Sequence, residues 1–321
     1  MTRAEQPAGG PRPAGPAQRG ARSRLRAYLM LAKIDVPDYW LAVPIAWSAT
    51  APARLLSTVP AATVQTLAIA SGYWATVALD DVQGSRDGSD ATNYAESTDR
   101  PRHRKPVVTG ELDVRLARRF AVGTLAVSVL AALAGIALAP YSPWWLFAVA
   151  LATVALSAQY SAGLKVSYRG PGLSECLLFV SMAVSVLIPA VSLHGGASTL
   201  DVAESVVAGL WMVKIAVCSN SHDVAGDAVA RRHTTAVTLS AAANRRYVAS
   251  LFLVEWAGTA AFLVLGWLPW LTIALLAPCY TLQVRQLRLG PVGGDWLAAR
   301  RLGFLALRVG AAGLIATNLL T

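Results

Sequence analysis

Charged residues are scarce in this chain of 321 residues, and long stretches contain none of them. Asp, Glu, Lys and Arg make up 14% of the residues, whereas a soluble domain typically carries about 25%. None of these four residue types occurs in the segments 55–79, 120–164, 176–200 and 256–284. A helix that crosses a bilayer needs about 20 such residues. The sequence therefore predicts an all-α polytopic membrane protein and excludes a disordered chain.

Cysteine and histidine are also rare, which restricts the metal chemistry that the chain can offer. The three cysteines, Cys176, Cys218 and Cys279, lie in apolar segments, and their odd number gives no disulfide framework. The four histidines are scattered and lack the spacing of zinc ligands. Any metal site must therefore be built mainly from carboxylates.

The apolar segments predict about nine membrane helices, and the positive charges sort by topology. The predicted spans are 27–50, 58–79, 117–138, 143–163, 173–194, 202–222, 247–267, 269–286 and 303–320. With these spans, 25 of the 28 Lys and Arg residues fall on one side of the membrane. By the positive-inside rule this side is cytoplasmic and contains the N-terminus. Membrane topology thus explains the net charge of +10, and we expect no nucleic-acid partner. We expect a multi-pass protein of the cell membrane.

The N-terminal segment differs in composition from the rest of the chain. Residues 1–25 are rich in Pro, Gly, Ala and Arg, which predicts a disordered basic tail in contact with anionic membrane lipid. Residues 26–321 then form one transmembrane domain.

Two clusters of acidic residues lie at the ends of predicted membrane helices. The second span leads into Asp80, Asp81, Asp87 and Asp90, and the sixth leads into the segment 220–227. Carboxylates at the C-terminus of a helix oppose its macrodipole, so helix stability does not explain them. A cation bound between the clusters would offset this cost.

The spacing within each cluster favours a shared metal site. Asp223 and Asp227 are four residues apart and Asn220 precedes them by three, so one helical face would carry all three. Asp80 and Asp87 are about two turns apart. Mg²⁺ prefers oxygen ligands and is often held by a few carboxylates together with substrate phosphates.

Basic residues follow both acidic clusters and favour a phosphate-bearing ligand. They are Arg86, Arg102, Arg104, Lys105, Lys165, Arg169, Arg231 and Arg232. Carboxylates, a divalent metal and basic groups beside an apolar bundle fit a ligand with a diphosphate head and a hydrocarbon tail. The alternative is a solvated surface on which acidic residues only balance Lys and Arg.

Four segments in a fixed order resemble the motifs of the UbiA-type membrane prenyltransferase superfamily. The stretch 80–90 resembles N-D-x-x-D-x-x-x-G-x-D, as found in menaquinone-pathway naphthoate prenyltransferases. Residues 105–112, K-P-V-V-T-G-E-L, resemble R-P-L-x-S-G-x-L. Tyr160-Ser161 with residues 168–175 is similar to Y-S…Y-R-G-x-G-E, and residues 222–234 resemble the second Asp-rich motif.

The resemblance implies a fold, a reaction and a set of site residues. The fold is about nine helices around a central cavity that cytoplasmic loops cap. The reaction is Mg²⁺-dependent ionisation of an isoprenoid diphosphate, followed by transfer of the prenyl chain to an acceptor, for which we expect a small aromatic molecule. The carboxylates assigned to Mg²⁺ are Asp80, Asp81, Asp87, Asp90, Asp223 and Asp227. The residues assigned to the diphosphate are Lys105, Lys165, Arg169, Arg231, Arg232 and Asn220. Tyr160 would face the ionising carbon or the diphosphate and, with Asp80, Asp87, Asp223 and Asp227, act in catalysis.

The sequence also departs from the family pattern, and these departures leave other reactions open. Asp80 stands at the initial Asn and Gly84 at the following Asp. We expect Asp87 to replace this Asp by a shift along the helix. A Gly at this position also resembles the terpene-cyclase branch, so cyclisation of the prenyl diphosphate is an alternative. An ion-coupled transporter is a second alternative, although it would favour charges near the membrane midplane and inverted repeats. Lys214 and Glu255, inside predicted spans, form either part of an acceptor pocket or a structural ion pair.

Overall fold

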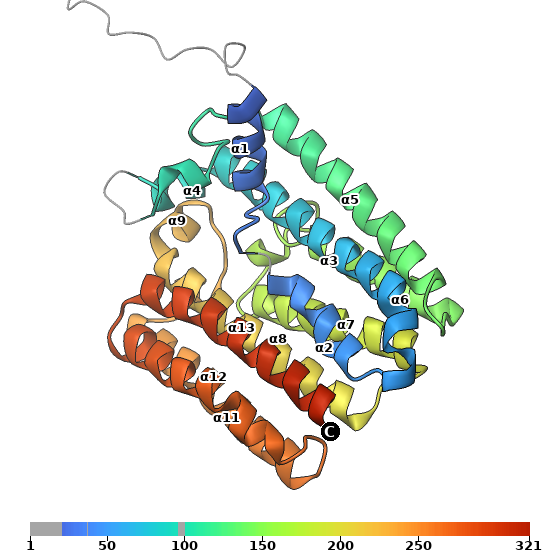
Figure 1. Cartoon of the computed structure of the whole chain (residues 1–321). Coiled ribbons are helices and arrows are strands. Elements are labelled where there is room, and N and C mark those ends of the chain that lie inside the picture. The colour runs from blue at the N-terminus through green and yellow to red at the C-terminus, as the bar shows by residue number, and fades with distance from the viewer. Residues whose placement is uncertain (1–20, 37, 96–99) are drawn as a thin grey trace, which may run out of the picture.

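The computed structural model describes residues 21–36, 38–95 and 100–321, and Figure 1 shows that these parts form a bundle of helices. They contain thirteen α-helices and no strand. Six helices are long and apolar enough to cross a membrane: α3 (Pro52–Asp87), α5 (Val114–Ala137), α7 (Leu173–His194), α8 (Thr199–His222), α11 (Ala241–Val264) and α13 (Trp296–Leu320). The prediction of an all-α polytopic membrane protein is confirmed.

Two further predicted spans correspond to shorter helices. α6 (Trp144–Ala158) has 15 residues and α12 (Leu271–Leu287) has 17. After α12 the chain continues through a π-helical turn at Arg288–Val292 before α13 begins. Eight of the nine predicted spans therefore each match one helix of the structure.

The first predicted span is wrong as a single helix. Within residues 27–50 the chain forms the end of α1 (Ala21–Leu31), a short 3₁₀ turn at Asp38–Leu41 and α2 (Ala42–Ser48). Lys33 takes a left-handed backbone conformation with φ 48° after α1. The break lets Lys33 reach Asp81 at 3.0 Å and lets Asp38 reach Arg308 at 2.8 Å. Lys33 and Asp38 both lie in the break between α1 and α2.

The N-terminal boundary also differs from the prediction. Residues 1–20 of the predicted tail lie outside the described residues. Residues 21–25, which were assigned to the tail, belong to α1. The described part of the chain is therefore helical from Ala21, ahead of the predicted boundary at residue 26.

The helices form two outer groups with a core between them. α3 and α5 lie side by side on one side, α11, α12 and α13 lie on the other, and α2, α7 and α8 lie between them (Figure 1). The largest buried cluster joins α2, α7, α8, α12 and α13. Small residues let these helices approach closely, as at Gly310, where an added Cβ would lie 2.4 Å from the ring of Trp211.

Both acidic clusters lie where a long helix passes into a short one. α3 ends at Gly88, whose φ of 82° suits a residue without a Cβ, and α4 (Ser89–Asn93) follows. α8 ends at His222, and α9 (Val224–Val229) and α10 (Thr235–Thr238) follow. α4 packs against α9, where the Gly226 amide donates a hydrogen bond to Asn93 Oδ1 at 3.2 Å. This contact holds the two clusters at the same end of the bundle.

Candidate functional site

Two cavities meet at the end of the bundle that carries the acidic clusters. One is apolar, with a volume of about 280 Å³, and extends between α3, α5, α6, α7 and α8. The other is polar, with a volume of about 300 Å³, and lies under α4, α9 and the start of α13. The residues that line both cavities form what we call the neck: Lys33, Val36, Asp80, Ser219, Arg300 and Phe304.

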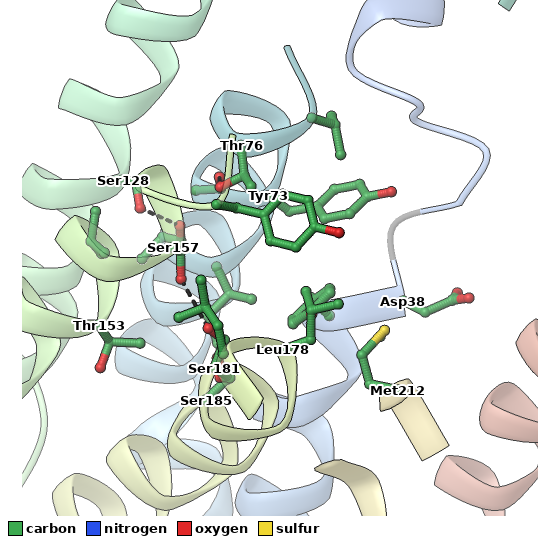
Figure 2. A pocket seen from close by; sticks show the side chains of 18 of the residues that line it. Asp38, Tyr73, Thr76, Ser128, Thr153, Ser157, Leu178, Ser181, Ser185 and Met212 are labelled. Atoms are coloured by element: carbon green, nitrogen blue, oxygen red, sulfur yellow. Dashed lines mark hydrogen bonds between the residues drawn. The ribbon is translucent and has the colours of Figure 1, made fainter. Parts of the chain in front are cut away.

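The apolar cavity has hydrocarbon walls with hydroxyl groups on one side. Figure 2 shows Thr76, Ser128, Ser157 and Ser181 around it. Ser157 and Ser181 share a hydrogen bond of 3.1 Å between α6 and α7. Two predicted site residues, Tyr160 and Asn220, also line this cavity, and Asn220 donates to Glu175 at 3.2 Å.

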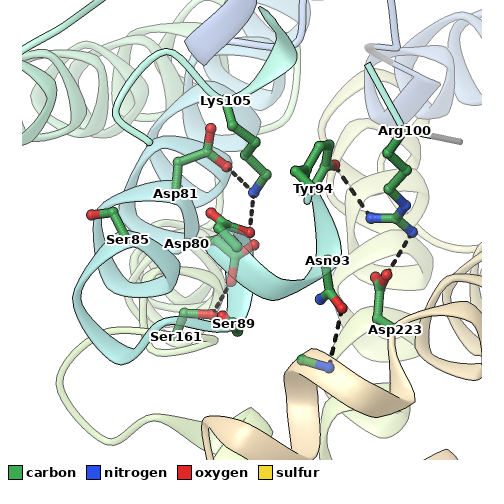
Figure 3. Close-up of polar contacts among 12 residues, drawn as sticks. Asp80, Asp81, Ser85, Ser89, Asn93, Tyr94, Arg100, Lys105, Ser161 and Asp223 are labelled. Atoms are coloured by element: carbon green, nitrogen blue, oxygen red, sulfur yellow. Dashed lines mark hydrogen bonds and ion pairs between the residues drawn. The ribbon is translucent and has the colours of Figure 1, made fainter. Parts of the chain in front are cut away.

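Four of the predicted carboxylates line the polar cavity, each beside a cation. Asp80 lies 3.2 Å and Asp227 lies 3.8 Å from Arg232, which therefore joins both acidic clusters. Asp90 pairs with Lys105 at 2.8 Å. The last of the four, Asp223, pairs with Arg100 at 2.8 Å, as Figure 3 shows.

Two other predicted carboxylates do not reach the cavities. Asp81 is fully buried and accepts hydrogen bonds from Lys33 at 3.0 Å and Lys105 at 2.6 Å. It lies one residue after Asp80, and a rotation of about 100° around α3 turns it away from the neck. Asp87 accepts hydrogen bonds from Tyr168 and from the hydroxyl of Ser89 at the turn into α4.

Gly84 lies directly against the carboxylate of Asp90. A Cβ added at Gly84 would lie 2.5 Å from Asp90 Oδ2. An Asp at this position would occupy the space that Asp90 now fills from the next helix. The structure therefore places the carboxylate of Asp90, and not that of Asp87, against Gly84.

The predicted phosphate-binding residues divide in a similar way. Lys105 and Arg232 line the polar cavity, whereas Lys165, Arg169 and Arg231 do not line any described cavity. Lys165 lies over the ring of Tyr168 at 5.3 Å, and Arg169 donates to the Leu164 carbonyl at 2.9 Å.

Several cations of the site were missed by the sequence reasoning. Arg100 and Arg300 line the polar cavity, and Lys33 belongs to the neck. Their positions in the chain had been explained by the positive-inside rule alone. An Arg-Pro pair at residues 100–101, close after the first acidic cluster, is the one signal that pointed to Arg100.

Burial and neighbouring charges shift the pKa values of the side chains that line the polar cavity, and the two effects act in opposite directions. Burial raises the pKa of Asp227 to about 7, although Arg232 lowers it in part. Burial likewise raises the pKa of Asp90 to about 6. Burial alone would lower the pKa of Lys105, but Asp81 and Asp90 raise it well above its usual value. The site therefore holds fixed positive charge beside carboxylates that titrate near neutral pH.

The donor chemistry of the polar cavity fits Mg²⁺ when a ligand supplies further oxygens. Asp80, Asp90, Asp223 and Asp227 offer only carboxylate oxygens, which Mg²⁺ prefers. Asp90 Oδ2 is buried and has no hydrogen-bond partner. Within the described parts of the chain, no three or more His, Cys, Asp or Glu side chains are close enough to hold a metal by themselves. The arrangement therefore suits a metal shared with a phosphate group.

Of the two alternatives for Lys214 and Glu255, the structure shows the ion pair. Lys214 donates to Glu255 Oε2 at 2.9 Å, and Trp211 donates to Oε1 at 3.0 Å. Both charged residues are almost fully buried, and neither lines a described cavity. The pair therefore joins α8 to α11 inside the bundle.

Comparison with known proteins relates this chain to one family. The sequence pattern of the UbiA prenyltransferase family matches residues 40–308. A 1,4-dihydroxy-2-naphthoate octaprenyltransferase of Mycobacterium tuberculosis is 32% identical over 201 residues, which cover 61% of this chain and 68% of that protein.

Solved structures share the fold at low sequence identity. A UbiA homolog from Aeropyrum pernix K1 superposes with a TM-score of 0.64 at 16% identity, covering 88% of this chain and 98% of that one. A digeranylgeranylglyceryl phosphate synthase gives 0.62 at 12% identity, with coverage of 93% and 99%. A UbiA homolog from Archaeoglobus fulgidus bound to GPP and Mg²⁺ gives 0.51 at 16% identity, with coverage of 88% and 99%.

Proposed function

The chain belongs to the UbiA prenyltransferase family, and we propose that it transfers a prenyl chain from an isoprenoid diphosphate to an aromatic acceptor, with Mg²⁺ as cofactor. The observation that carries this proposal is the neck between the two cavities. It joins a polar cavity of carboxylates and cations to an apolar cavity inside the bundle. A prenyl diphosphate has the same two parts, a charged head and a hydrocarbon tail.

The polar cavity binds the diphosphate. Lys105, Arg100 and Arg232 supply fixed positive charge, and Asp80, Asp90, Asp223 and Asp227 would hold Mg²⁺. Mg²⁺ held by these carboxylates would neutralise the diphosphate oxygens and make the group easier to displace. When the head group binds, the side chain of Arg232 is free to exchange its carboxylate partners for phosphate oxygens, because both interactions are charge-assisted.

The neck is where the carbon–oxygen bond breaks. The C1–O bond of the prenyl diphosphate breaks, and its electron pair leaves with the diphosphate. A ring carbon of the acceptor forms a bond to C1, and the proton on that ring carbon is lost. Arg232, Arg100 and Lys105 stabilise the charge that develops on the leaving group. Tyr160, which lines the apolar cavity beside the neck, faces the carbon that carries the positive charge.

The apolar cavity holds the hydrocarbon tail and excludes water. Its walls come from aliphatic side chains such as Ile69, Val77, Leu178, Ile188 and Ile215. Water exclusion matters because water would capture an allylic cation and yield an alcohol. The hydroxyls of Thr76 and Ser128 donate to helix carbonyls, and those of Ser157 and Ser181 bond to each other, so these four groups are already paired.

The names of similar proteins support the substrate classes. The Archaeoglobus homolog was solved with GPP and Mg²⁺, and the Mycobacterium relative is named for a naphthoate acceptor. We further propose that the N-terminus of this chain lies in the cytoplasm and that the protein resides in the cytoplasmic membrane. The distribution of its Lys and Arg residues supports this orientation.

Cyclisation loses its main support from the sequence. Gly84 had suggested the terpene-cyclase branch, but its contact with Asp90 gives the missing side chain a packing reason. A transporter does not account for two acidic clusters held at one end of the bundle. We therefore place transfer ahead of both alternatives.

The test is an incubation of purified protein in detergent with Mg²⁺ and geranyl, farnesyl and geranylgeranyl diphosphates. Each diphosphate is supplied with and without a panel of phenols and naphthols, and products are identified by mass spectrometry. A prenylated aromatic product that requires the acceptor and disappears with a chelator is expected. A cyclic hydrocarbon formed without acceptor would overturn transfer in favour of cyclisation.

A further inference from the structure

A third cavity lies at the end of the bundle away from the acidic clusters. It has a volume of about 510 Å³ and lies between the α2–α3 link and the α7–α8 link. We call it the far pocket. Asp201, which lines it, and Asp223 are 22 residues apart along α8, which corresponds to about 33 Å. The hydrocarbon core of a bilayer is about 30 Å thick. With the acidic clusters at one boundary of the bilayer, the far pocket therefore lies among the lipid head groups of the other.

Arg54 is a cation at an end of the bundle that otherwise lacks Lys and Arg. With the predicted spans, 25 of the 28 Lys and Arg residues lie on the other side of the membrane, and Lys214 and Arg308 lie within helices. Arg54 lines the far pocket and donates a hydrogen bond to the hydroxyl of Tyr141. Tyr141 packs against Gly195, where an added Cβ would lie 2.9 Å from its ring. Among the described residues, Arg54 forms no ion pair. Its charge is therefore available to an anion.

Asp201 has one carboxylate oxygen that its role in the helix does not use. Oδ2 accepts hydrogen bonds from the Ser198 amide at 2.8 Å and from the Ser198 hydroxyl at 2.7 Å, as part of a capping box at the start of α8. Oδ1 has no hydrogen-bond partner although the residue is only 1% exposed. The ring of His194 lies 3.5 Å from Oδ1 and shares a hydrogen bond of 3.1 Å with Thr50. A carboxylate oxygen can accept more than one hydrogen bond, and a buried unpaired one costs free energy. Oδ1 therefore fits a donor that a ligand brings.

We propose that the far pocket binds the head group of an aminophospholipid such as phosphatidylethanolamine. Arg54 binds the phosphate, and Asp201 Oδ1 accepts a hydrogen bond from the ammonium group. The acyl chains lie against the outside of the bundle, where Leu56, in the same first turns of α3 as Arg54, is 86% exposed. The bound lipid thus connects the start of α3 to the start of α8. The inference does not depend on prenyl transfer, because the far pocket and the neck lie at opposite ends of the bundle.

A metal ion is the competing occupant, and the composition of the pocket disfavours it. Within the part of the chain that the structure describes, no three His, Cys, Asp or Glu side chains are close enough to hold a metal. Arg54 lines the same pocket and would repel a metal ion. A ligand with a phosphate alone would bring negative charge towards a buried carboxylate that stays unpaired. A zwitterionic head group supplies an opposite charge to both residues.

Three lipids with the same acyl chains separate the two contacts. Dioleoylphosphatidylethanolamine carries the phosphate and an ammonium group that can donate. Dioleoylphosphatidylcholine has methyl groups in place of those donors, and dioleoylphosphatidylglycerol has no cation. The apparent Kd of each lipid is measured by native mass spectrometry on the purified, delipidated full chain in detergent. The wild type should bind the ethanolamine lipid about tenfold more tightly than the other two, because a charge-assisted hydrogen bond is lost with either.

Variants assign each contact to its residue. Asp201→Asn should weaken binding of the ethanolamine lipid about tenfold and leave the choline lipid unchanged. Arg54→Gln should weaken both lipids by a similar factor, because both carry the phosphate. Ser198→Ala removes a hydroxyl of the capping box and keeps the charge of Asp201, so it should lower the thermal midpoint and keep the ratio between the two lipids. Arg285→Gln, at an exposed arginine near the end of α12, is the matched control for Arg54 and should keep the wild-type preference.

Different failures give different patterns. The proposal is overturned if the wild type binds the three lipids equally, or if Asp201→Asn keeps the preference for ethanolamine. Loss of the preference in Ser198→Ala as well would assign the effect to the cap of α8. Displacement of the lipid by an equal concentration of glycerophosphoethanolamine, which has no acyl chains, would make the occupant a soluble molecule. A preference that holds in a protein with no prenyl transfer activity would leave the lipid site standing without the proposed function.

Discussion

The two acidic clusters look alike in the sequence but differ in how the fold uses them. The second cluster offers Asp223 and Asp227, and both line the polar cavity. The first offers twice as many carboxylates, yet only Asp80 and Asp90 reach the cavity. Its other members hold the structure together. The comparison shows that spacing along a helix determines the face on which a carboxylate lies. Contacts with distant segments then determine whether that carboxylate lines the polar cavity.

The largest loss of activity is expected when a carboxylate that lines the polar cavity is replaced. Asp227→Asn should lower the rate of prenyl transfer by about 100-fold or more, because it removes a proposed metal ligand from the polar cavity. Its thermal melting should stay close to that of the wild type. Activity within tenfold of the wild type would remove Asp227 from the site.

Asp81 should show the opposite behaviour. Asp81→Ala leaves Lys33 and Lys105 without the buried carboxylate that both contact, which should cost about 3–5 kcal/mol of stability. Thermal or denaturant unfolding in detergent measures this loss. A variant that keeps its stability but loses metal binding would instead make Asp81 a member of the site.

Gly84 tests whether Asp90 replaces the missing carboxylate. Gly84→Ala should weaken Mg²⁺ activation about tenfold, because the new Cβ would displace the Asp90 carboxylate that lies 2.5 Å away. Gly84→Asp should be at least as harmful. Gly123→Ala is the matched control, since no atom lies within 4 Å of the added Cβ. Tighter Mg²⁺ binding in Gly84→Asp would contradict the packing explanation.

The smallest effect should appear in the pH dependence of metal binding. Because the pKa of Asp227 is raised to about 7, its carboxyl is mostly protonated below this pH and must lose the proton to bind Mg²⁺. The concentration of Mg²⁺ needed for half-maximal activation should fall by up to about tenfold from pH 6 to pH 8. Equal values at pH 6, 7 and 8 would show that Asp227 does not titrate in this range.

Much of the fold could be predicted because long uncharged segments leave few alternatives. Eight spans match single helices, since each is apolar over enough residues to be recognised alone. The first span was wrong because its polar residues are stabilised by partners far away in the sequence, as Lys33 is by Asp81. No local pattern contains that information.

The candidate site could be predicted only in part from the sequence. Asp80, Asp90, Asp223 and Asp227 line one cavity, which the two clusters had suggested. Whether Asp81 or Asp80 faces the neck depends on the rotation of α3 against its neighbours, which the bundle sets. Arg300 could not be singled out, because its place at the neck depends on how α13 packs against the other helices.

Lys105 affects how the carboxylates of the polar cavity can exchange their partners. It contacts the structural Asp81 and the cavity-lining Asp90 at the same time. When Asp90 turns to another cation, Lys105 keeps its contact with Asp81, which it shares with Lys33, and is not left as an isolated buried ammonium. The exchange of partners would therefore leave Lys105 beside a carboxylate throughout, so no buried cation has to lose its last negatively charged neighbour.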